Sequence, residues 1–141
     1  SAEMVAEDAG IRLRLTLEPA IMAVPLRLDL HRARQALSNV LDNALSYAHS
    51  EVQVTVRRAG SHAAVIRVEN DGDLPSRDEL GELWRLRYRG QNSRSQSGLG
   101  IGLPFVKAVA DLHGWVAELA IEGKRFVLQL TLPICKDTES N

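Results

Sequence analysis

Cysteine, lysine and long apolar runs are all scarce in this 141-residue chain. Cys135 is the only cysteine, which excludes an intramolecular disulfide and a cysteine-rich zinc site and favours a reducing compartment. No apolar run approaches the roughly 20 residues that a helix needs to cross a bilayer, so we expect a soluble domain without direct membrane contact. The formal net charge of −1 gives no general attraction to nucleic acid.

The length suits one domain of two packed layers, which we expect over residues 1–133, with a polar tail over residues 134–141 that looks disordered from residue 136. Asp29 is the expected N-cap of the longest helix, residues 30–48, and shorter helices are predicted near residues 77–86 and from Pro104 to the residue before Gly114. Alternation of apolar and polar residues predicts five strands, at residues 11–17, 52–57, 64–69, 115–121 and 125–132. The short apolar run at residues 21–24 is expected to pair with the first of these strands.

Helices interleaved with hairpins favour an α+β two-layer sandwich over a doubly wound parallel sheet. We expect a mixed, mostly antiparallel sheet of about five strands, covered on one face by about three helices.

Amide side chains and a tyrosine recur every four residues on the longest predicted helix: Gln35, Asn39, Asn43 and Tyr47. Positions four apart advance only about 40° around a helix, so the four side chains share one face. A single such residue is more often a solvated edge or half of an i,i+4 amide pair, but the aligned set favours a polar ligand. Amide oxygens suit Mg²⁺ that is held mainly by phosphates and water.

The stretch GLGIGLPFVKAVADLHG begins with Gly98, Gly100 and Gly102 and continues into a predicted helix. Glycines let backbone N–H groups approach a ligand closely, and a helix N-terminus attracts anions, so the stretch is a candidate phosphate cradle. Glycines that only permit tight packing would give the same pattern. The stretch is not a Walker motif, since no Gly-Lys-Ser/Thr follows, nor a dinucleotide fingerprint, since a polar loop precedes it.

Residues 68–75, VENDGDLP, follow an apolar run, and the last six of them combine an amide, two acids, a glycine and a proline. This composition allows a turn, a metal loop or one wall of a ligand pocket, but the acids lack the spacing and distant glutamate of a calcium loop. One of several nearby arginines could reach a phosphate, while most are expected on a solvated surface. These arginines are Arg85, Arg87, Arg89 and Arg94.

The spacing of the histidines and of the possible nucleophiles in the sequence does not indicate a separate active site. The four histidines lack zinc-ligand spacing and are interpreted as surface or capping residues: His31, His49, His62 and His113. No nucleophile with a base partner is evident, so no catalytic residue is assigned beyond the candidate ligand site.

In their order along the chain, these motifs resemble those of the ATP-binding catalytic domain of bacterial sensor histidine kinases, in the superfamily that includes gyrase, Hsp-type chaperones and MutL. QALSNVLDNALSYA is similar to the N box, VENDGDLP to the G1 box, LWRLRYRG to the F box and GLGIGLPFVKAVADLHG to the G2 box. RFVLQLTLP is similar to the last strand of the family's domain, so the resemblance covers residues 11–133. It implies a Bergerat-type fold with ATP and Mg²⁺ as cofactors.

The resemblance also implies roles for individual residues. Asn43 would bind Mg²⁺, with Gln35 as a second candidate metal ligand, and Asn70 would stand at the adenine-reading position. The implied nucleotide-binding residues are Asn39, Asn43, Tyr47, Asn70, Gly72, Leu74, Arg89, Gly98, Leu99, Gly100, Gly102 and Leu103.

The chain departs from the family pattern at several positions. The family has an aspartate where this chain has Asn70, a second glycine near Leu74, and often a basic residue where this chain has Ser46. Trp84 also replaces the phenylalanine of the F box. These departures keep two alternatives open: a catalytically degenerate nucleotide-sensing or scaffolding module, and a serine kinase or ATPase of the same superfamily.

The resemblance implies a protein histidine kinase that donates the γ-phosphoryl group of Mg-ATP to a histidine on a separate dimerisation domain, from which a response regulator receives it. The phosphoacceptor motif is absent from this fragment. By resemblance, the acceptor would lie in an N-terminal helical hairpin of a longer, homodimeric sensor in the bacterial inner membrane, with this domain in the cytoplasm.

Overall fold

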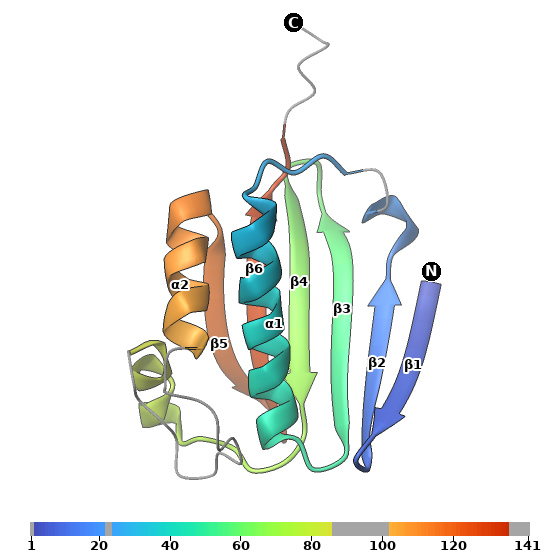
Figure 1. The fold of residues 1–141 in the computed structure, drawn as a ribbon, viewed down its shortest axis with the longest axis vertical. Helices are drawn as coiled ribbons and strands as arrows, with labels where there is room; N and C mark the ends of the chain where they lie inside the picture. The colour runs from blue at the N-terminus through green and yellow to red at the C-terminus, as the bar shows by residue number, and fades with distance from the viewer. Residues whose placement is uncertain (1, 22–23, 86–101, 136–141) are drawn as a thin grey trace, which may run out of the picture.

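The computed structural model describes residues 2–21, 24–85 and 102–135, which form a six-stranded sheet with helices on one face (Figure 1). The order of the strands in the sheet is β1-β2-β3-β4-β6-β5. The β2–β3 pair is parallel and the other four pairs are antiparallel, which confirms the predicted α+β class with six strands instead of about five. The strands are β1 (Ala2–Asp8), β2 (Ile11–Leu17), β3 (Glu51–Ala59), β4 (Ala63–Asn70), β5 (Val116–Glu122) and β6 (Arg125–Pro133).

Two α-helices, α1 (Leu30–Tyr47) and α2 (Gly102–His113), lie side by side over the sheet (Figure 1). Asp29 caps α1 as predicted, because its Oδ1 accepts a hydrogen bond from the backbone N–H of Arg32 at 3.1 Å. Small and branched side chains carry the packing of the two helices against each other and the sheet. The buried ones are Ala33, Ala36, Val40, Ala44, Leu103, Val106, Val109 and Ala110.

The two faces of the sheet differ in polarity because strand residues alternate between them. Val52, Val68 and Leu128 point toward the helices and are buried in the core. The opposite face carries the ion pairs that Arg67 makes with Glu69 and Glu122. A ligand that needs an enclosed site is therefore expected on the helical side.

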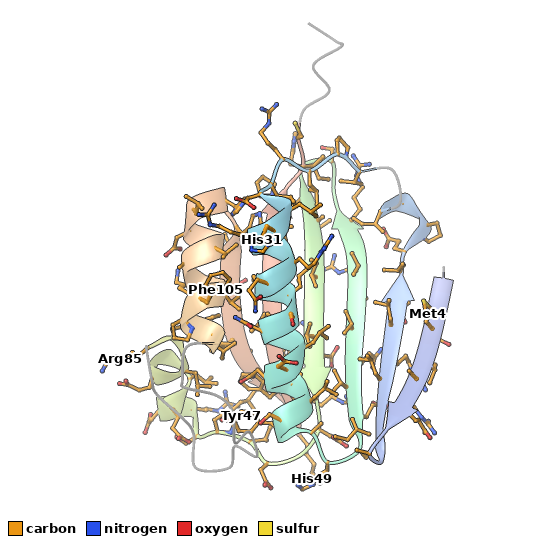
Figure 2. All side chains as sticks on the ribbon, viewed as in Figure 1. Met4, His31, Tyr47, His49, Arg85 and Phe105 are labelled. Carbon is orange, nitrogen blue, oxygen red and sulfur yellow. The ribbon has the colours of Figure 1, made fainter. Side chains whose placement is uncertain are left out.

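The edge strand β1 was not predicted from the sequence. Its residues do not alternate cleanly, and Met4 is 65% exposed on a part of the sheet that neither α-helix covers (Figure 2). The strand is held by the backbone ladder to β2 and by ion pairs from Glu3 to Arg14 and from Glu7 to Arg12. Such pairing leaves no hydrophobic signal in the sequence.

Of two shorter predictions, one was wrong and the other was confirmed in part. Ile21 and Val24 do not pair with β2, because Ile21 ends a 3-10 helix, η1 (Pro19–Ile21), and the backbone N–H of Val24 donates a turn hydrogen bond to the Ile21 carbonyl oxygen at 3.3 Å. Residues 22–23 lie outside the described part of the chain. The short helix predicted near residues 77–86 is present as two 3-10 helices, η2 (Arg77–Glu79) and η3 (Gly81–Trp84), and residue 86 lies outside the described part.

His113 joins the end of α2 to the start of α1. Its Nε2 accepts a hydrogen bond from the backbone N–H of Asp29 at 2.8 Å, and its Nδ1 lies 2.9 Å from the carbonyl oxygen of Val109. The ring therefore carries its proton on Nδ1, since a carbonyl can only accept. The ring also lies 4.9 Å from that of Trp115, so the side chain fixes the two helices at the end remote from Tyr47.

The last described residues continue past β6. Ile134 and Cys135 donate backbone hydrogen bonds to the carbonyls of His62 and Pro25, each at 2.9 Å. Residues 136–141, where disorder was predicted, lie outside the described part. Among the described helices, none combines the length and apolar character that crossing a bilayer requires.

Candidate functional site

Several of the predicted site residues lie where α1 and β4 end and where α2 begins, in the lower half of the view in Figure 1. Tyr47 is the last residue of α1, and Figure 2 shows it beside His49, which follows the helix. Asn70 is the last residue of β4, and Gly102 is the first of α2. We call this region the α1–β4 corner.

Asp71 holds the α1–β4 corner together. Its Oδ1 accepts hydrogen bonds from the backbone N–H groups of His49, Ser50 and Glu51 at 3.1, 3.0 and 3.1 Å, and its Oδ2 accepts one from the Ser50 hydroxyl. Partial burial alone would raise the pKa of this carboxyl, but the hydrogen bonds from Ser50, Glu51 and His49 lower it from 3.8 to about 2. The carboxylate thus fixes the turn from α1 into β3 against the end of β4.

Gly72 lies directly against the end of α1. Its φ angle is +108°, and a Cβ added there would lie 2.2 Å from the Tyr47 carbonyl oxygen and 3.0 Å from the His49 nitrogen. Both the backbone conformation and the contact therefore require glycine. The structure gives Gly72 a packing role; its predicted contact with a nucleotide stays a prediction.

Asn70 points into the molecule beneath the helices, because it lies two residues after Val68 on the same face of β4. Its side chain is fully buried, and Nδ2 donates to the carbonyl oxygen of Asp71 at 2.7 Å. This bond fixes the amide orientation, since a carbonyl can only accept. Oδ1 has no hydrogen-bond partner among the described residues, which marks it as an acceptor suited to a ligand N–H group.

The amide face of α1 contacts the start of α2. The Gln35 Nε2 donates to Asn39 Oδ1 at 2.9 Å, and Asn39 Nδ2 donates to the Gly102 carbonyl oxygen at 3.2 Å. The i,i+4 amide pair that the sequence left open is therefore present. Asn43 lies one turn further toward Tyr47 and is partly buried.

The remaining predicted site residues fall into two groups. Leu74 is partly buried against the core, and Leu103 is 5% exposed within it, so their side chains pack inside the molecule. Four others lie outside the described residues: Arg89, Gly98, Leu99 and Gly100. Among the described residues, no group of three or more His, Cys, Asp or Glu side chains could hold a metal ion.

Sequence reasoning did not assign Asp71 and Ser50 to the site. Both residues are typical of turns, and only the register that places Asn70 opposite Val52 brings the Asp71 carboxylate to the start of β3. A sequence signal was present in the acid directly after a predicted strand. It could not be distinguished from an ordinary turn residue.

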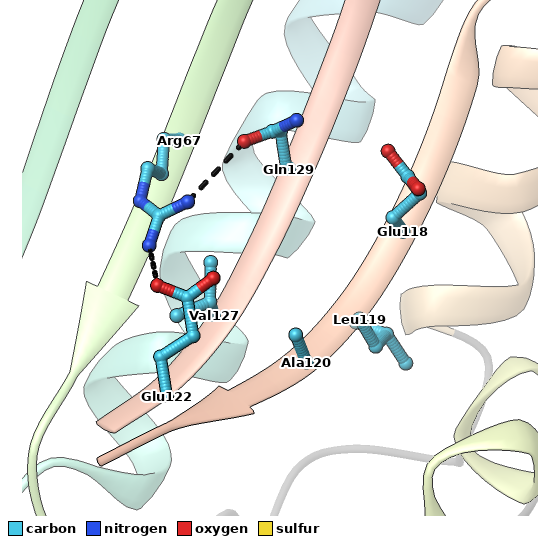
Figure 3. A pocket seen from close by; sticks show the side chains of 7 residues that line it. All are labelled: Arg67, Glu118, Leu119, Ala120, Glu122, Val127 and Gln129. Atoms are coloured by element: carbon cyan, nitrogen blue, oxygen red, sulfur yellow. Dashed lines mark hydrogen bonds and ion pairs between the residues drawn. The ribbon is translucent and has the colours of Figure 1, made fainter. Parts of the chain in front are cut away.

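A hollow lies on the outer face of the sheet, away from the α1–β4 corner (Figure 3). There Arg67 points across β6 between Gln129 and Glu122 and hydrogen-bonds to both. The volume of about 150 Å³ is below the range of small-molecule sites, and the guanidinium already has protein partners. This hollow is therefore a closed ion-pair network on the outer face, separate from the α1–β4 corner.

Comparison with known proteins gives a family match over most of the described chain. The family described as "Histidine kinase-, DNA gyrase B-, and HSP90-like ATPase" matches residues 28–134. Sensor histidine kinase CusS of Escherichia coli O6:H1 is 37% identical over 134 residues, which cover 91% of this chain and 27% of that protein. Sensor protein kinase PmrB of Pseudomonas aeruginosa is 32% identical over 131 residues, covering 89% and 26%.

A solved structure shows the same fold. The mycobacterial sensor histidine kinase MprB superposes with a TM-score of 0.76 at 22% identity, covering 89% of this chain and 84% of that one. This chain spans about a quarter of the length of the curated relatives CusS and PmrB.

Substituting Gly72 tests the contact with the end of α1. We expect Gly72→Ala to lower the free energy of unfolding by about 3 kcal/mol or more, because a Cβ collides with backbone atoms at a positive φ. Gly60→Ala is the matched control, since Gly60 has φ +71° and no atom of the described residues lies within 4 Å of an added Cβ. Gly60→Ala should lower the free energy of unfolding, measured by urea denaturation, by only about 1 kcal/mol. Equal losses in the two variants would contradict the collision.

Lowering the pH tests the Asp71 carboxylate. Because its folded-state pKa of about 2 lies below the ordinary 3.8, its contribution is fully present above pH 3.8 and is lost as the pH falls through 2. Asp71→Asn should therefore destabilise the protein at pH 7 by roughly 1 to 2 kcal/mol, after discounting for solvent screening, and by less near pH 2. Denaturation across this range measures the difference. The exposed Asp42→Asn is the control, and a pH-independent Asp71→Asn loss would refute the account.

Proposed function

Because the chain belongs to the histidine kinase-, DNA gyrase B- and HSP90-like ATPase family, we propose that residues 1–133 form a domain that binds Mg-ATP at the α1–β4 corner. We further propose that it supplies the γ-phosphoryl group to a histidine on a separate dimerisation domain of the same protein, and that a response regulator then receives the group. The similarity to sensor histidine kinases CusS and PmrB supports this direction of transfer.

The observation that carries the nucleotide proposal is the buried Oδ1 of Asn70, which has no hydrogen-bond partner within the described part of the chain. A buried acceptor without a donor costs free energy, and the exocyclic amine of adenine is a donor of the required kind. Guanine presents an oxygen at the same ring position and would leave two acceptors facing each other. The fixed orientation of the Asn70 amide therefore favours adenine.

The proposed phosphate end of the site lies between the amide face of α1 and the first turn of α2. The first-turn N–H groups of a helix have no internal partners and attract anions, and Pro104, which lacks an N–H, removes only a donor that the helix could not have used internally. Asn43 would offer an amide oxygen to Mg²⁺, which when bound neutralises charge on the phosphates. The residues of the chain contribute binding and orientation, which is how phosphoryl transfer is generally assisted.

Loss of catalysis is the second candidate. Ser46 carries no charge where the resemblance expects a basic residue, which favours a nucleotide-sensing module. Incubating the full-length protein with radiolabelled ATP distinguishes the kinase from the nucleotide-sensing module. Acid-labile, base-stable phosphate on a histidine supports the kinase, whereas nucleotide binding without it supports the sensor. Acid-stable phosphate on a serine indicates the serine-kinase alternative.

Calorimetric titration with nucleotide tests the proposed site. We expect Mg-ATP to bind, and Mg-GTP to bind on the order of tenfold more weakly because it lacks the exocyclic amine at that position. Absence of heat, confirmed by unchanged thermal stability at millimolar Mg-ATP, would remove the ATP proposal. Equal binding of the two nucleotides would instead remove the role of Asn70.

Asn43→Ala tests the metal contact. Removal of a Mg²⁺ ligand should weaken ATP binding mainly when Mg²⁺ is present, by about tenfold, and have little effect in the presence of a chelator. The neighbouring exposed residue provides the control, Asp42→Ala, which is expected to bind ATP as the wild type does in both conditions. Equal weakening of Asn43→Ala with and without Mg²⁺ would contradict the assignment.

A further inference from the structure

Two hydrogen bonds connect an exposed side chain of α1 to the first residue of α2. Gln35 Nε2 donates to Asn39 Oδ1 at 2.9 Å, and Asn39 Nδ2 donates to the Gly102 carbonyl oxygen at 3.2 Å. Gln35 is exposed, Asn39 is partly buried, and the second bond joins residues 63 positions apart in the sequence. The three groups form a hydrogen-bonded relay, Gln35–Asn39–Gly102, that runs from solvent to the N-terminus of α2.

The direction of the hydrogen bonds in this relay is determined by its inner end, at Gly102. A backbone carbonyl can only accept, so Asn39 must turn its Nδ2 toward Gly102 and its Oδ1 toward Gln35. Gln35 must then act as the donor. If the group at position 35 could only accept, it would repel the Asn39 Oδ1 that faces it and favour a flipped amide, whose Oδ1 would face the Gly102 carbonyl oxygen.

We propose that Gln35 is a positioning residue that acts through Asn39 to hold the N-terminus of α2 in the orientation that receives nucleotide phosphates. The inference rests on the proposed function, because it concerns the phosphate end of the same site. Both hydrogen-bonding groups of the Asn39 amide are engaged inside the protein. Because Gln35 Nε2 is the donor to Asn39 Oδ1, the proposed role of Gln35 is that of a hydrogen-bond donor, in place of the metal-ligand role that the resemblance implies.

The consequence is that donor character at position 35 matters, and metal-binding character does not. Three substitutions separate the two roles, because they rank in opposite orders. A metal ligand would be improved in Gln35→Glu, removed in Gln35→Met and replaced by a repelling charge in Gln35→Lys. A relay donor would be retained in Gln35→Lys, removed in Gln35→Met and reversed in Gln35→Glu.

The experiment is calorimetric titration of the wild type and the three variants with ATP, in Mg²⁺ and in chelator. We expect ATP binding within about twofold of wild type for Gln35→Lys, about threefold weaker for Gln35→Met and about tenfold weaker for Gln35→Glu, in both conditions. Adenosine, which has no phosphates, should bind all four proteins equally.

Charge alone could give the same order, since ATP is an anion. Ser38 is exposed on α1 close to the same face, so Ser38→Glu and Ser38→Lys carry the same charges without the hydrogen bond. They should change ATP affinity by less than about twofold in physiological salt, where exposed charges are screened. Changes as large as those at Gln35 would overturn the relay.

Hydrogen exchange of the free protein supplies a readout that needs no nucleotide. Without the relay, backbone amides in the first two turns of α2, such as that of Val106, should exchange faster in Gln35→Met than in the wild type, whereas β6 should be unchanged. Unchanged exchange together with unchanged ATP affinity would overturn the positioning role while leaving ATP binding intact. Failure of the wild type itself to bind ATP would instead count against the proposed function.

Discussion

The fold depends on how closely the chain after β4 can pass beneath the end of α1. Gly72 takes a positive φ there because a side chain would collide with the Tyr47 carbonyl oxygen. Asp71, one residue earlier, accepts hydrogen bonds from the backbone N–H groups of the turn that leads from α1 into β3. The end of α1, the start of β3 and the end of β4 are thereby held together in one corner, next to Asn70.

The same corner determines the character of Asn70. An amide at this position can donate to the Asp71 carbonyl at 2.7 Å and keep its own oxygen for a ligand. An ionised carboxylate would place an oxygen against that carbonyl and would be buried without a counter-charge, which is unfavourable. The departure from the family pattern is thus consistent with the geometry of this chain and does not by itself indicate lost function.

Periodicity and capping predicted most of the fold, because the long helix has an apolar stripe after Asp29 and the buried strands have clear alternation. The strand β1 could not be predicted, since edge ion pairs such as that of Glu7 with Arg12 leave no hydrophobic pattern. At the site, the sequence indicated the amides and Asn70. It did not indicate the Asp71 clamp or the Asn39 contact with Gly102, because both depend on tertiary register.

The central claim is that Mg-ATP lies between the amide face of α1, the end of β4 and the start of α2. A crystal structure of the protein with Mg²⁺ and a non-hydrolysable ATP analogue tests it most directly. We predict the adenine amine within hydrogen-bond distance of Asn70 Oδ1 and the phosphates beside the first turn of α2. Nucleotide bound elsewhere, for example at Arg67 on the outer face of the sheet, with the corner empty, would contradict the account.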